Sequence, residues 1–189
     1  MKRYMIHLKN DGSHTAKDAT VLLYNARELV QDPEVIVRDT RVSKRYIEFD
    51  TSIPDNTTVD NIIVRLEAIS PVASYDHIVE RHMEKEDAIK HAVQLFNEEK
   101  YWGAHEALEL VWKSTRDARE KSIVNGIILI AAAFVHDEKD EPEICISILQ
   151  RAIKKLQSAK GTYHGIDIDR IADLTAKIIN SGRIERFTI

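Results

Sequence analysis

The ten residues GIILIAAAFV (126–135) are apolar almost without interruption. A membrane-spanning helix needs about 20 such residues, so this run is too short to cross a bilayer. A helix that is apolar on all sides is instead covered on all sides by other parts of the protein. The run therefore predicts the central helix of a helical bundle, within a helix over 118–138.

Helical spacing of apolar residues continues on both sides of this run. From about residue 83 onward the strand period is absent, and Ile89, Ala92, Val93 and Phe96 recur at helical spacing. Further helices are expected over three ranges: 102–114, 142–159 and 169–180. The C-terminal half is thus predicted to be a bundle of about five helices.

The N-terminal half mixes the periods of strands and helices. Strands are expected near 3–9, 34–42, 44–52 and 72–79, and helices from Ala19 and from about Thr57. Thr15 and Asp18 have the spacing of a capping box before the first of these helices. The order strand–helix–strand–strand–helix–strand predicts a ferredoxin-like βαββαβ domain. The chain is therefore expected to be an α+β protein with domains at 1–80 and 81–189.

Composition excludes some classes of function. The net charge is −4, so no overall basic field attracts nucleic acid. Tyr46 and Phe49 are three residues apart and point to opposite faces of a regular strand, which argues against an RNA-recognition sheet. An interaction or dimerisation role for the sheet and a solvated domain that only shields the bundle are both compatible with the sequence, and nucleic acid is not expected as a partner.

Location and redox state follow from the N-terminus and the cysteine count. The opening MKRYMIHLKND has no apolar signal region, and no run is long enough for a membrane helix. The single cysteine, Cys145, lies between two isoleucines and is expected to be buried and without a disulfide. These features predict a cytoplasmic protein.

The stretch AHEALELVW (104–112) begins like the zinc-protease signature HExxH, but Glu109 stands where the second histidine would be. On a helix, His105 and Glu109 lie one turn apart, and Glu106 points about 100° away from His105. One hypothesis is a metal-dependent hydrolase, with zinc, iron or manganese as the ion. Its ligands are His105, Glu109 and His136, and Glu106 is the catalytic base.

A buried structural network is the favoured alternative. Glu109 would fix the tautomer of His105 under Trp112, and Asn97, Asn125 or His136 would satisfy the remaining polar atoms. A third hypothesis is a pocket for a small polar ligand without chemistry. Its expected lining is Trp112, Trp102, His105 and Glu109, with Tyr101 and His136 at the rim.

The helical half resembles a known family. FNEEKYWGAHEALELVWKS (96–114), NGIILIAAAFVH (125–136) and YHGIDIDRIADL (163–174) are similar to the signature of domain-of-unknown-function family 309, over about residues 85–182. Leu129 and the stretch DEKDEPE (137–143) depart from the family pattern. The resemblance implies a small all-helical fold and brings no established activity. The first domain lies outside it.

The sequence therefore predicts a non-catalytic ligand-binding or protein-interaction protein, with a metal-dependent hydrolase as the alternative. It does not decide whether the protein is an enzyme. No cofactor is predicted beyond the divalent metal of that alternative. The partner is an unidentified small ligand or protein, and a homo-oligomer is compatible with the sequence.

Overall fold

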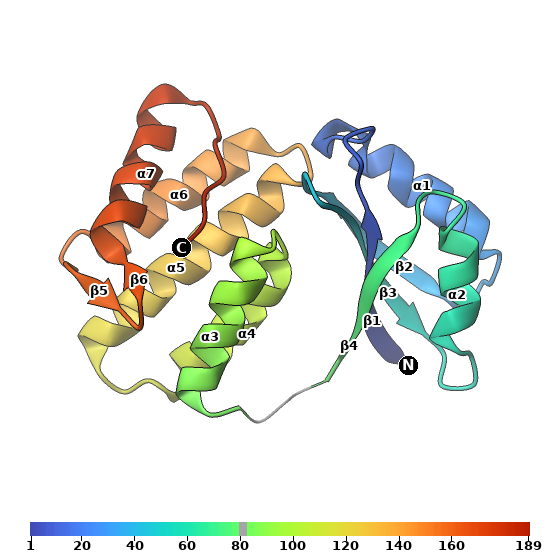
Figure 1. Ribbon diagram of the computed structural model, residues 1–189, viewed down its shortest axis with the longest axis horizontal. Helices are drawn as coiled ribbons and strands as arrows, with labels where there is room; N and C mark the ends of the chain where they lie inside the picture. The colour runs from blue at the N-terminus through green and yellow to red at the C-terminus, as the bar shows by residue number, and fades with distance from the viewer. Residues whose placement is uncertain (80–82) are drawn as a thin grey trace. The chain divides into compact units, whose positions relative to one another are not determined.

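The computed structural model describes residues 1–79 and 83–189 (Figure 1). The chain divides into two compact units, Met1–Arg81 with Glu138–Asp140, and His82–Asp137 with Glu141–Ile189. The predicted domain boundary between residues 80 and 81 lies outside the described residues.

The first unit is a four-stranded sheet with two helices. In chain order its elements are β1 (Lys2–Lys9), α1 (Ala19–Val30), β2 (Ile36–Val42), β3 (Tyr46–Ile53), α2 (Val59–Leu66) and β4 (Val72–Ile78). The strands lie in the order β2-β3-β1-β4, and each neighbouring pair is antiparallel. The predicted α+β class and the βαββαβ order are confirmed.

Alternation along the strands decides which face of the sheet the helices cover. Ile47, Phe49 and Ile53 of β3 are fully buried in one apolar cluster with Leu22 of α1 and Ile62 of α2. Because successive side chains of a strand point to opposite faces, Glu48, Asp50 and Ser52 face away from that cluster. Both helices therefore pack on one face, as Figure 1 shows.

The entry to α1 uses the predicted capping residues. The main-chain N–H of Thr15 donates to Asp18 Oδ2 at 2.7 Å, and a short 3₁₀ turn, η1 (Ala16–Asp18), leads into the helix. These contacts satisfy donors that a helix start leaves without partners in the helix. The local sequence thus determines where this helix begins.

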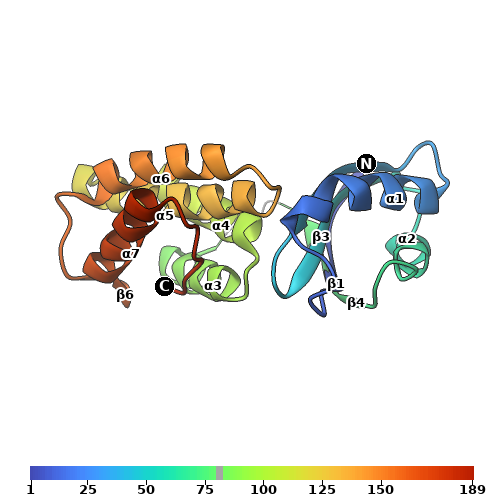
Figure 2. The ribbon, with the colours of Figure 1, turned by 90° about the horizontal axis from the view of Figure 1, so that it is seen from above.

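The second unit contains five helices and a short hairpin. The helices are α3 (Lys85–Asn97), α4 (Tyr101–Ser114), α5 (Ala118–Asp137), α6 (Pro142–Leu156) and α7 (Ile168–Ser181). Their number agrees with the predicted bundle. Figure 2 shows α5 among the other helices of this unit, and Ile127, Ile130 and Phe134 of α5 are fully buried.

One close approach explains a glycine in the apolar run. A Cβ placed on Gly126 of α5 would lie 2.5 Å from Leu156 Cδ2 of α6. A larger residue would require the Leu156 side chain or the end of α6 to shift. Gly126 therefore lets these two helices pack closely.

The hairpin β5 (Thr162–Tyr163) and β6 (Ile166–Asp167) was not expected from the sequence. Its two turn residues, His164 and Gly165, both have positive φ, at 45° and 87°. A two-residue turn of this kind matches the twist of paired strands. The strands are too short to give a recognisable alternation. No helix in the described part of the chain is long and apolar enough to cross a membrane.

Candidate functional site

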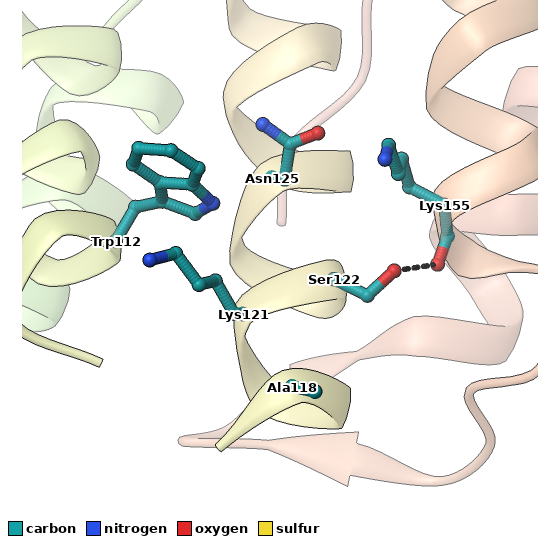
Figure 3. A pocket seen from close by; sticks show the side chains of 6 residues that line it. All are labelled: Trp112, Ala118, Lys121, Ser122, Asn125 and Lys155. Carbon is teal, nitrogen blue, oxygen red and sulfur yellow. Dashed lines mark hydrogen bonds between the residues drawn. The ribbon is translucent and has the colours of Figure 1, made fainter. Parts of the chain in front are cut away.

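A hollow of about 350 Å³ lies where α4 ends, α5 begins and α6 ends (Figure 3). Its lining residues come from these three helices: Trp112, Ala118, Lys121, Ser122, Asn125 and Lys155. Lys121 and Ser122 lie near Asn125 on one side of the first turns of α5, because residues three and four positions apart are neighbours on a helix. The local fold thus brings two lysines, an amide and an indole together.

Most of the polar groups in this hollow are hydrogen-bond donors. The Lys121 ammonium lies 4.3 Å from the centre of the Trp112 ring, a cation–π contact. Ser122 Oγ donates to the main-chain oxygen of Lys155 at 3.0 Å, the bond drawn in Figure 3. Within residues 1–79 and 83–189, neither lysine has a carboxylate partner. In the same ranges, the Trp112 indole N–H and the Asn125 amide have no hydrogen-bond partner.

The carboxylate of Glu120, one residue before Lys121, is engaged elsewhere. Glu120 accepts from the Lys85 ammonium and from the Tyr163 hydroxyl, the latter at 2.9 Å. The Lys85 hydrogen bond lowers the pKa of Glu120, whereas burial raises the pKa of Tyr163. Glu120 is therefore bound by partners other than Lys121 and Lys155.

The HExxE residues lie along the surface of α4. His105 Nδ1 is 3.4 Å from Glu106 Oε1, and His105 Nε2 is 3.9 Å from Glu109 Oε1. Glu109 is closer to Lys113, at 3.1 Å. None of the side chains of His105, Glu106 and Glu109 is buried. This corrects the expectation of a sealed network, because Glu109 is shared with an exposed lysine one turn further on.

The other predicted pocket residues are dispersed over the bundle. Tyr101 is buried, with its ring centre 5.0 Å from that of Phe96. Asn97 forms hydrogen bonds with the main chain of Ile189, and His136 Nδ1 lies 2.5 Å from Glu141 Oε2. Of the residues predicted for the network or the pocket, Trp112 and Asn125 line the hollow in Figure 3.

The predicted metal ligands are not assembled in the part of the chain that the structure describes. No three His, Cys, Asp or Glu side chains there come together in an arrangement that could hold an ion. His105 and Glu109 face each other on one helix, whereas His136 is paired with Glu141 at the end of another. A base role for Glu106 stays a prediction.

Sequence reasoning missed most of the hollow. Lys121, Ser122 and Asn125 are polar residues at the start of a helix whose later turns are apolar. This change from polar to apolar residues along α5 was the available signal for the α5 side of the hollow. Lys155 lies 30 or more residues away along the chain, and no local pattern connects it with α5.

The comparisons with known proteins agree with the resemblance noted from the sequence. Residues 89–148 match the family described as Domain of unknown function (DUF309). This match runs from α3 into α6 and includes Trp112, Lys121 and Asn125, whereas Lys155 lies beyond it. The N-terminal part of the chain matches no family. No curated protein matches the chain.

Proposed function

We propose that the protein is a non-catalytic binding protein, and that its helical unit holds a small anion in the hollow between α4, α5 and α6. The observation that carries this proposal is a group of hydrogen-bond donors around the hollow that have no acceptor among the described residues. Two lysines, a tryptophan and an asparagine line one hollow, and in the described ranges no carboxylate pairs with either lysine. Hydrogen bonds from charged donors to an anion are about twice as strong as bonds between neutral groups.

The size and lining of the hollow restrict the ligand. A volume of about 350 Å³ is at the small end of ligand pockets, which commonly have several hundred Å³. Trp112 supplies an apolar wall, and Lys121 already lies over its ring. These features favour a compact molecule that carries phosphate or carboxylate groups, with a small apolar part against the indole.

The test is a titration of the purified full-length protein with inorganic phosphate, pyrophosphate and citrate, followed by calorimetry. Saturable binding of at least one anion is expected. Lys121→Gln or Lys155→Gln is expected to weaken that binding about ten-fold, since a charged hydrogen bond contributes about 1.5–3 kcal/mol. Trp112→Phe keeps an aromatic wall but removes the N–H donor, and a smaller loss is expected.

Lys154→Gln is the matched control, because Lys154 is an exposed neighbour on α6 that does not line the hollow. Equal weakening in this control would indicate a general charge effect instead of a site. Absence of saturable binding for all three anions would contradict the proposal.

We also propose a ferredoxin-like classification for the first unit and a cytoplasmic location for the protein. The strand order β2-β3-β1-β4 with antiparallel neighbours supports the classification, since the split βαβ arrangement places its strands in this order. Cys145, a buried free thiol, supports a reducing location. Fluorescence microscopy of a tagged chain, with fractionation as a check, tests the location.

A further inference from the structure

The last residues of the chain form an extended segment on the helical bundle. After α7 ends at Ser181, Gly182 adopts a left-handed conformation with φ 68°, and its N–H donates to the main-chain oxygen of Ile178. Residues 183–189, called here the tail segment, form neither helix nor strand. Contacts with other elements of the bundle therefore determine their path, visible in Figure 1 as the trace leading to the C label.

Side chains of the tail segment contact the ends of α3 and α5. The Phe187 ring centre lies 5.3 Å from that of Phe134 and 6.2 Å from that of Phe96. Arg186 Nε donates to Asp137 Oδ2 at 2.6 Å, and its guanidinium carbon lies 6.0 Å from the Tyr101 ring centre. One aromatic and one basic residue of the tail thus have matching partners in the bundle.

The main chain of the tail segment is also recognised. Asn97 Nδ2 donates to the main-chain oxygen of Ile189 at 3.0 Å, and Asn97 Oδ1 accepts from the Ile189 N–H at 2.8 Å. A paired donor and acceptor of this kind bind an extended backbone, as a neighbouring strand would. Arg170 adds a hydrogen bond to the main-chain oxygen of Thr188 at 2.7 Å.

These partners form a defined surface, called here the tail site: Phe96, Asn97, Tyr101, Phe134 and Asp137. Three of them, Phe96, Asn97 and Tyr101, belong to the motif on which the family resemblance rests. The whole site lies within the matched residues 89–148, whereas the tail segment lies outside them. The site and its occupant are therefore separate parts of the sequence.

We propose that the tail site is a docking site for an extended peptide, and that in trans it binds the tail segment of a second copy of this chain. The contacts above define the peptide that fits this site. It has a basic residue followed by an aromatic residue, and an extended main chain whose N–H and C=O groups form hydrogen bonds with Asn97. A second copy carries this sequence by identity. If two copies exchange tails, each site stays filled and the same contacts form between copies, with Gly182 as the point where the chain changes direction.

A charge exchange between two full-length variants tests this proposal. Arg186→Glu and Asp137→Lys each place like charges together when the tail binds its own bundle. When the two variants are mixed, both exchanged pairings join opposite charges. Analytical ultracentrifugation is expected to show a heterodimer in the mixture, at a concentration about ten-fold below that at which either variant alone dimerises.

The double variant Arg186→Glu with Asp137→Lys is the matched control, since it restores opposite charges within one chain. It is expected to show no preference for dimers over the wild-type protein. Circular dichroism of each single variant checks that it is folded. If folded variants sediment in the mixture as they do alone, the proposal is overturned.

A labelled peptide of residues 182–189 provides a second measurement that does not depend on dimer formation. It is expected to bind the Arg186→Glu protein, whose own tail is released, at least about ten-fold more tightly than the wild-type protein. The same peptide with Arg186→Glu is expected to prefer the Asp137→Lys protein. Failure of both peptides to bind folded protein would overturn the docking site. Peptide binding without a heterodimer in the mixture would overturn the exchange between copies.

Discussion

Two histidine–glutamate pairs, one in each unit, differ sharply in their surroundings. In the sheet, His7 Nε2 lies 2.6 Å from Glu48 Oε2, and the two side chains are 3% and 7% exposed. On α4, His105 Nε2 lies 3.9 Å from Glu109 Oε1, with the side chains 24% and 37% exposed. The pair whose residues are one helical turn apart in sequence is loose, and the tight pair joins residues 41 positions apart. Sequence proximity is therefore a poor guide to how strongly two polar groups are coupled.

The sheet pair belongs to a buried ionic group with Arg41. His7 and Glu48 lie directly opposite each other on β1 and β3, and Arg41 lies opposite Glu48 on β2. Arg41 Nε also donates to Glu48. Burial alone would raise the pKa of Glu48, but the charge of Arg41 and the hydrogen bonds from His7 and Arg41 outweigh it and lower this pKa to about 2. Glu48 is thus an ionised acid, and its carboxylate is the hydrogen-bond partner of both His7 and Arg41.

The helix pair has weaker and competing contacts. Glu109 is nearer to Lys113 than to His105, and His105 also faces Glu106. Exposed ion pairs are screened by water and contribute little to stability. The comparison predicts that substitutions in the two pairs have very different effects.

The largest effect is expected for Glu48→Gln. This change leaves Arg41 buried without its main counter-charge, and breaking a buried pair from one side costs about 3–5 kcal/mol. The free energy of unfolding, measured by chemical denaturation at pH 7, should fall by that amount. Glu109→Gln is the matched substitution in the other pair, and a change below about 0.5 kcal/mol is expected for it. Similar losses in both variants would contradict the comparison.

A smaller effect is expected on acidification. The pKa of Glu48 is lowered in the folded state, from 4.5 to about 2, so its ionised form favours folding above pH 4.5. As the pH falls from about 4.5 to about 2, this contribution of about 3 kcal/mol is lost. The difference in unfolding free energy between the wild-type protein and Glu48→Gln should therefore be smaller at pH 2.5 than at pH 5. A constant difference between them over this range would exclude Glu48 as the titrating group.

The smallest effect on stability is expected for His105→Ala. The side chain is partly exposed and its nearest carboxylate oxygen is 3.4 Å away, so a loss of less than about 1 kcal/mol is expected. Thermal unfolding of the variant beside the wild-type protein measures it. A loss of several kcal/mol would show that the HExxE residues support the bundle in a way their contacts do not indicate.

The same variant separates the binding proposal from the hydrolase alternative. Elemental analysis after dialysis against zinc, iron and manganese is expected to find no stoichiometric metal in either protein, because the described residues contain no three-ligand cluster. Stoichiometric metal in the wild-type protein that is lost in His105→Ala would instead support a metal site and justify a search for hydrolysis assisted by Glu106.

Local sequence patterns determined the elements of this protein. The β-branched and aromatic residues of 44–52 indicated a strand, and GIILIAAAFV indicated a buried helix. The capping residues Thr15 and Asp18 also lie within one turn of each other. Each of these signals depends on residues a few positions apart, so the period of the backbone alone makes them readable.

Tertiary structure decided which polar groups meet. Strand register placed Glu48 between His7 and Arg41, and helix packing brought Lys155 to the hollow beside Lys121. It also laid Phe187 and Ile189 against α3, some 90 residues earlier in the chain. A repeat of apolar residues shows which face of an element is buried, but it does not show what covers that face. The candidate sites of this protein depend on that second fact, because their groups come from elements that meet only when the chain packs.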